Sequence, residues 1–137
     1  MTKKSQLQNF NILENEKKYW VAGDCPITAA IDVIGGKWKP VIIWILLNGA
    51  KRFGELHKLI PGIALKVLSR QLKELEIHGI IIRTAFPEVP PRVEYNLTEK
   101  GKSLSDIMQS LSVWSQENVL QPSEVGAATQ MKDNKNR

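Results

Sequence analysis

The chain has 137 residues, which fits one ordinary domain with short appendages and argues against two full domains. Hydrophobic residues make up 42% and charged residues 24%, a balance that excludes a fully disordered chain. The net charge of +5 favours a polyanionic partner over a cationic one. The longest apolar run, Val41 to Leu47, is far shorter than the roughly 18–20 residues of a spanning helix, and the polar start has no signal region. We therefore expect a cytoplasmic protein without a membrane partner.

The chain has a single cysteine, Cys25. An intrachain disulfide framework and a multi-thiolate zinc site are excluded, because both need paired thiolates. The histidines, His57 and His78, have no neighbouring residues at metal-ligand spacing. We expect no metal ion and no other cofactor.

The two ends of the chain differ in composition from its middle. Residues 1–18 are polar and rich in Lys, Asn and Gln, and residues 121–137 contain Pro122, Gly126 and a mixed polar tail. We predict a flexible N-terminal extension over 1–18, an ordered domain over 19–120 and a flexible C-terminal tail over 121–137.

The first expected helix begins at Asp24-Cys25-Pro26, because proline is tolerated in the first turn, and it ends at Gly35-Gly36. Its apolar residues have helical spacing: Ile27, Ala30, Ile31 and Ile34.

Residues 38–47 are apolar almost all round, which favours a fully buried central helix. A strand is the alternative, because branched residues are frequent there. Residues 53–60 then predict a brief amphipathic helix that ends at Pro61-Gly62.

The clearest helix covers the segment after Ala64 and ends at Gly79. Its leucines lie three and four residues apart on one stripe: Leu65, Leu68, Leu72 and Leu75. At 100° per residue its cationic side chains, Lys66, Arg70 and Lys73, lie on the opposite side.

Residues 80–86 and 92–97 predict a two-stranded antiparallel hairpin. Three prolines at its tip, Pro87, Pro90 and Pro91, make the loop stiff and poor at further strand pairing. Thr98 then caps one last helix. Its apolar stripe needs a partner, because the domain is already closed, and consists of Leu104, Ile107, Leu111 and Trp114.

This order of elements is that of a winged helix-turn-helix domain, mainly α with a small β-hairpin wing. A helix that enters the major groove shows small, polar or basic side chains outward while its leucines anchor inward. The residues that meet this demand are Lys66, Ser69, Arg70 and Lys73. The alternative is an ordinary charged surface helix, because Glu74 and Glu76 lie on it too.

Several separated motifs occur in an order that is typical of one family. They are Cys25-Pro26, Ile34-Gly35-Gly36-Lys37-Trp38, Arg52-Phe53 with Glu55-Leu56, Leu68 through Leu75-Glu76, Gly79, and Pro90-Pro91-Arg92-Val93-Glu94-Tyr95 with Leu97-Thr98. From Asp24 to Trp114 the chain resembles the HxlR-type winged helix-turn-helix regulators. The resemblance implies a bacterial homodimer, joined through terminal helices, that regulates transcription at palindromic operator DNA. It also implies that some members sense quinones, aldehydes or oxidants through the cysteine.

Two positions depart from the family pattern. Ala64 stands where Ser or Thr usually opens the recognition helix, so the helix lacks a capping bond. His57 stands where Arg is common, which makes one cationic contact weaker or pH-dependent.

The candidate DNA contacts lie in three places. On the basic helix, Lys66, Ser69, Arg70 and Gln71 are candidates for base edges and backbone, with Lys73 on the same cationic face. Arg92 at the wing is a candidate for the minor groove or a phosphate, and an ion pair with Glu88 or Glu94 is the alternative. Near helix starts, where backbone N–H groups favour phosphate, lie Lys37, Lys39 and Arg52, with plain solvation as the alternative.

Cys25 lies just ahead of a helix start, where the helix dipole lowers the pKa of a thiol, although Asp24 opposes this. An inert buried thiol is the alternative to sensing. Without a second cysteine, its products would be an intersubunit disulfide, a mixed disulfide with a small thiol, or an adduct with an electrophile.

Two other classes of protein compete with a regulator. A thiol enzyme needs a base beside Cys25, and neither histidine lies near it in sequence, so we do not expect an enzyme. A winged-helix module that binds protein is opposed, although not excluded, by the basic helix face.

Overall fold

The computed structural model describes residues 25–120. Both expected terminal segments, 1–18 and 121–137, lie outside the described residues, as do residues 19–24 of the expected domain. The elements in chain order are α3 (Pro26–Ile34), α4 (Lys39–Leu46), β1 (Lys51–Arg52), α5 (Phe53–Leu59), α6 (Leu65–Ile77), β2 (Ile81–Phe86), β3 (Arg92–Leu97), α7 (Glu99–Lys102) and α8 (Ser105–Asn118).

The first two described helices lie close to where the sequence predicted them. Helix α3 begins with Pro26 after the N-cap residue Cys25, and it ends where the Gly35 N–H donates to the Ile31 carbonyl. Residues 39–46 form helix α4, so the strand alternative is wrong. The expectation of complete burial is wrong for Trp44, which is exposed.

Helices α5 and α6 are joined by a tight turn that contains Pro61 and Gly62. Gly62 has φ +85°, a left-handed conformation that favours glycine. His57 Nε2 donates a hydrogen bond to the Ile63 carbonyl across 3.1 Å, which ties the end of α5 to the start of α6. On α6, three of the four predicted core leucines are buried, whereas Leu65 in the first turn is exposed.

The sheet has three strands in the order β1-β3-β2, with antiparallel pairing throughout. The hairpin pairs Ile81 with Leu97 at its base and Phe86 with Arg92 near its tip. The sequence predicted the hairpin of β2 and β3 but not the third strand, β1. In the sheet, Lys51 of β1 lies opposite Tyr95 of β3. Two residues are too few to show the alternation by which strands are recognised in a sequence.

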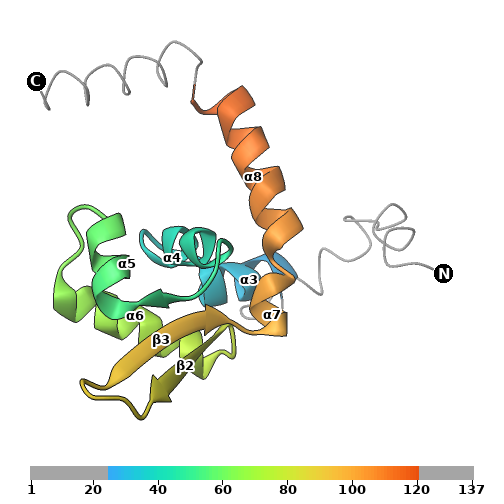
Figure 1. The fold of residues 1–137 in the computed structure, drawn as a ribbon. Coiled ribbons are helices and arrows are strands. Elements are labelled where there is room, and N and C mark those ends of the chain that lie inside the picture. Colours follow the sequence, from blue (N-terminus) through green and yellow to red (C-terminus); the bar gives the residue numbers. More distant parts are fainter. Residues whose placement is uncertain (1–24, 121–137) are drawn as a thin grey trace, which may run out of the picture.

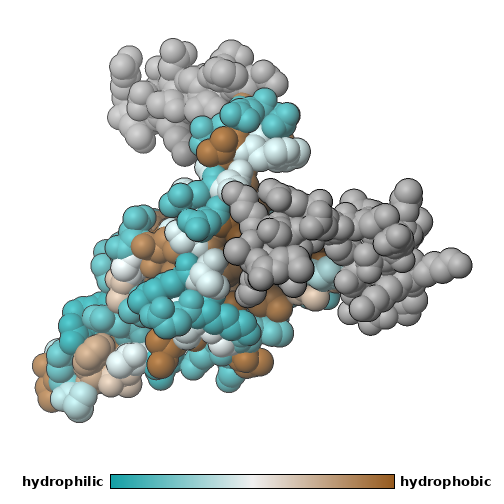
Figure 2. Space-filling view, turned by 90° about the vertical axis from the view of Figure 1, so that its right-hand side faces the viewer, coloured by the Kyte–Doolittle hydropathy of each residue, from teal (hydrophilic) through white to brown (hydrophobic). Residues whose placement is uncertain are grey.

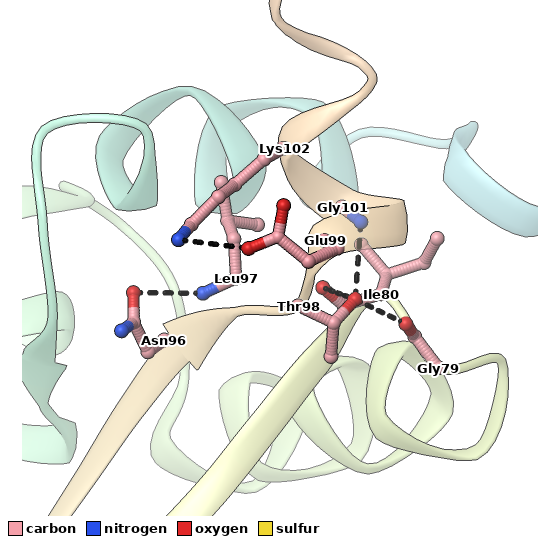
Figure 3. A network of polar contacts seen from close by, with 8 residues as sticks. All are labelled: Gly79, Ile80, Asn96, Leu97, Thr98, Glu99, Gly101 and Lys102. Atoms are coloured by element: carbon pink, nitrogen blue, oxygen red, sulfur yellow. Dashed lines mark hydrogen bonds and ion pairs between the residues drawn. The ribbon is translucent and has the colours of Figure 1, made fainter.

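The predicted last helix is two helices. Thr98 caps α7 by accepting a hydrogen bond from the Gly101 N–H at 3.0 Å, and its hydroxyl donates to the carbonyl of Gly79 (Figure 3). A Cβ at Gly101 would overlap the Ile80 carbonyl, so α7 packs backbone against backbone on the loop that follows α6. The chain then turns at Ser103 and continues as α8.

One hydrophobic core joins these elements. Its fully buried side chains come from α4, α5, α6 and β2: Ile42, Ile43, Leu46, Leu56, Leu68, Leu72, Leu75 and Ile81. Helix α8 projects away from this body (Figure 1), and Met108 is its buried residue. The helical body and the sheet thus fix α6, while α8 stands apart.

Candidate nucleic-acid interface

The outward face of α6 carries the polar and basic residues that the sequence predicted. Lys66, Ser69, Arg70 and Lys73 are exposed, and Gln71 is half-buried. Among the described residues, no carboxylate forms an ion pair with these three cations. Because Leu68, Leu72 and Leu75 anchor the opposite face, the helix presents free donors on a fixed backbone.

The start of α6 is open. Ala64 is the N-cap residue, with extended backbone, and it makes no side-chain cap. The first amides of the helix are therefore free of a capping oxygen and can donate to another acceptor, such as a phosphate.

Lys39 is paired instead of free. Its Nζ lies 2.7 Å from Glu74 Oε2 on α6, and its side chain is only 12% exposed. The hydrogen bond and charge of Lys39 lower the pKa of the Glu74 carboxyl, with a smaller contribution from Arg70. Plain solvation, one alternative for Lys39, is therefore wrong.

Lys37 and Arg52 differ from Lys39 in being exposed. The Lys37 ammonium lies 4.7 Å from the centre of the Trp38 ring, just before α4. The backbone N–H of Arg52 donates to Glu55 Oε1 across 2.9 Å, which fixes the start of α5. A phosphate contact stays a prediction for both side chains.

Arg92 is held within the wing. Its guanidinium lies 3.1 Å from a Glu88 oxygen and 3.4 Å from a Glu94 oxygen, and it stacks 4.0 Å from the centre of the Phe86 ring. The ion-pair alternative is thus present with both glutamates. A contact between Arg92 and DNA stays a prediction.

Cys25 is half-buried at the N-cap position of α3. Its side chain makes no capping hydrogen bond. The backbone N–H of Thr28, followed by the Thr28 hydroxyl, lowers the pKa of the Cys25 thiol, because both favour the thiolate, whereas partial burial opposes this.

The apolar stripe on α8 is exposed. Ile107, Leu111 and Trp114 are each more than half exposed, whereas Leu104 at the base is half-buried against the core. Figure 2 shows brown, hydrophobic atoms beside teal and white ones where α8 stands above the body. A shallow groove along this helix is lined by Ile107, Leu111 and Trp114.

Sequence reasoning missed exposed apolar residues outside α8 and an ion pair at the edge of the basic face of α6. Ile27 and Ile31 on α3 are exposed as well, and their spacing of four residues was the available signal for a second apolar surface. In the sequence, Glu74 indicates only that the face of α6 is not purely basic. Its partner is 35 positions away in the chain, so no local pattern indicated the pair.

The described residues form neither a metal centre nor a membrane span. Within residues 25–120, no group of three His, Cys, Asp or Glu side chains is placed to hold a metal ion. None of the helices in that range is both long and apolar enough to span a membrane.

The helix pair α5–α6, the three-stranded sheet and the outward basic face define a winged helix-turn-helix protein of the DNA-binding class. The family model described as HxlR-like helix-turn-helix matches residues 33–123. The chain belongs to this family.

Its relatives are transcriptional regulators. The uncharacterized HTH-type transcriptional regulator YtcD of Bacillus subtilis is 46% identical over 99 residues, which cover 72% of this chain and 75% of YtcD. The redox regulator HypR in its oxidized form is similar in structure, with a TM-score of 0.65 and 42% identity over 69% of this chain and 97% of HypR. The reduced form of the transcriptional regulator YodB from B. subtilis has a TM-score of 0.64 and 40% identity, over 69% of this chain and 94% of YodB. This chain is likewise a transcriptional regulator with a helix-turn-helix.

Proposed function

We propose that the protein forms a homodimer that binds a palindromic DNA operator in a sequence-specific manner. We further propose that modification of Cys25 changes the affinity of this dimer for that DNA. The observation that carries the proposal is the exposed basic face of α6, whose cations have no carboxylate partner among residues 25–120.

In this proposal α6 lies in the major groove. Arg70 is suited to a bidentate contact with guanine and Gln71 to one with adenine, while Lys66, Ser69 and Lys73 contact base edges or nearby phosphates. Lys37 and Arg52 contact the DNA backbone, which helps to fix the register of the helix. Arg92 orders the wing through its two glutamates, so a contact with DNA would require it to give up those pairs.

The exposed apolar stripe of α8 supports the dimer. A helix that leaves Ile107, Leu111 and Trp114 exposed keeps apolar area in contact with water, and a second copy removes that area from water. In the proposed two-fold dimer, the two α6 helices enter successive major grooves about 34 Å apart, as a palindromic operator requires.

The position of Cys25 supports thiol sensing. The groups that lower the pKa of its thiol raise the fraction of thiolate, which is the nucleophilic form. HypR is described as a redox regulator, and its oxidized and reduced forms both match this fold. With one cysteine in each chain, an oxidant such as diamide would take two electrons from two thiols and leave a disulfide between two molecules.

The experiment measures binding of the purified protein to duplex DNA from just upstream of its own gene, across salt concentrations, before and after treatment with diamide. Cys25→Ser is the matched variant. We expect sequence-preferring binding that weakens steeply with salt and, after diamide, weakens further in the wild type but not in the Ser variant. If diamide does not change the binding, the proposed sensing role of Cys25 is refuted, while the proposed DNA binding is unaffected. Absence of preference for any duplex would favour the other candidate, a module that binds protein.

A further inference from the structure

An ion pair joins the first residue of α4 to the DNA-facing helix α6. Lys39 Nζ lies 2.7 Å from Glu74 Oε2, and the two side chains are 12% and 43% exposed. The lysine is thus almost enclosed, while the glutamate reaches the surface.

Helix α4 by itself gives no reason for a buried lysine at this position. The first turn of a helix is its positive end, where a cation is disfavoured. Removing an ammonium group from water costs further free energy unless a partner compensates. Glu74 supplies that partner, so the position of Lys39 is explained by α6 and not by α4.

Glu74 in turn lies close to the residues that we propose read DNA. It follows Arg70 by four positions, which places the two side chains on neighbouring turns of one helix face. A free carboxylate there would repel phosphate and compete for the guanidinium of Arg70. The hydrogen bond from Lys39 and then its charge lower the pKa of the Glu74 carboxyl, ahead of smaller contributions from the charges of Arg70 and His78.

We propose that Lys39 is a positioning residue for DNA recognition: it holds α6 at one rotation against α4 through Glu74 and neutralises that carboxylate, without itself contacting a phosphate. The inference rests on the proposed function of α6. It separates Lys39 from Lys37, an exposed lysine two positions earlier for which we propose a phosphate contact.

The two lysines make a matched pair of variants, Lys39→Met and Lys37→Met, in which a similar stem is kept and the ammonium is removed. Each is compared with the wild type for binding to the upstream duplex and to a scrambled duplex of the same length, over a series of salt concentrations. An unfolding curve for each variant shows that it is folded at the assay temperature.

For Lys39→Met we expect a loss of about fivefold in affinity for the upstream duplex, little change for the scrambled duplex, and an unchanged slope of log affinity against log salt. For Lys37→Met we expect both duplexes to be bound more weakly, with the slope reduced by about 0.9 for each phosphate that the lysine neutralises in the wild type. A reduced slope in Lys39→Met, or an unchanged preference between the duplexes, would overturn the inference while leaving DNA binding in place.

Glu74→Gln tests the partner. If Lys39 acts through Glu74, adding Lys39→Met to Glu74→Gln lowers the preference for the upstream duplex little further. Losses that simply multiply in the double variant would show that Lys39 acts independently of Glu74. A wild type that prefers no duplex would overturn the proposed function, and this inference with it.

Discussion

The hydroxyl of Thr98 connects three parts of the molecule, and replacing Thr98 by Val removes it while keeping the branched shape. The hydroxyl accepts from the Gly101 N–H at 3.0 Å and donates to the Gly79 carbonyl. Gly101 is buried, so in the variant its N–H has no access to water as a replacement acceptor.

The expected loss can be worked out from these two bonds. Loss of a helix N-cap costs about 1 kcal/mol, and loss of a second hydrogen bond to a backbone carbonyl costs about 1 kcal/mol more. We therefore expect Thr98→Val to lower the free energy of unfolding by about 2 kcal/mol. With a urea dependence of about 2 kcal/mol per molar, the midpoint of urea unfolding falls by about 1 M.

The assay is urea unfolding followed by circular dichroism, at a single protein concentration because the proposed dimerisation would make stability depend on concentration. Thr98→Ser is the control, since it keeps the hydroxyl and loses only a methyl group. A midpoint for Thr98→Val within about 0.2 M of the wild type, or an equal loss in Thr98→Ser, would refute the reasoning.

Three further predictions concern the wing, the exposed helix and the thiol. Arg92→Met should lower affinity for the upstream duplex without reducing the salt slope, because the guanidinium is already paired with two glutamates; a slope lower by about 0.9 per site would instead indicate a phosphate contact. Leu111→Asp should give monomers in analytical ultracentrifugation at concentrations where the wild type is dimeric, with no loss of folding, because the side chain is exposed; a persisting dimer would contradict the proposed interface. Alkylation of Cys25 by iodoacetamide should speed up as pH rises through a midpoint below that of free cysteine, because Thr28 favours the thiolate, and Thr28→Val should move this midpoint upward; equal midpoints for the protein and free cysteine would contradict this cause.

Elements whose apolar residues recur at regular spacing were predictable from the sequence. Elements that depend on one close contact between distant residues were not. The leucine stripe of α6 and the alternation in β3 each recur along the segment, so one misplaced residue such as Leu65 does not hide them. The break between α7 and α8 has no periodic signal. Helix α7 before the break is held by Gly101 lying against the Ile80 carbonyl, a contact between residues 21 positions apart that no local pattern indicates.

In the candidate site, ion pairs between residues close in sequence were predictable, and those between distant residues were not. The pairing of Arg92 with Glu88 and Glu94 was open to sequence reasoning, because the partners lie within four residues of it. The pairing of Lys39 with Glu74 was not, because it depends on how α4 crosses α6. The positions of basic residues therefore follow from the sequence, whereas whether each cation is free follows from tertiary packing.

The projection of α8 from the body gives it the geometry of a lever (Figure 1). Its 14 residues span about 21 Å, so a tilt of about 10° at the base moves the far end by about 4 Å. The base is joined through α7 to Thr98, which is bonded to the loop directly after α6. In the proposed dimer, a shift of about 4 Å where the two arms meet would turn each body, α6 included, by about 10° as a rigid unit. The spacing between the two α6 helices would then change without any rearrangement of the core.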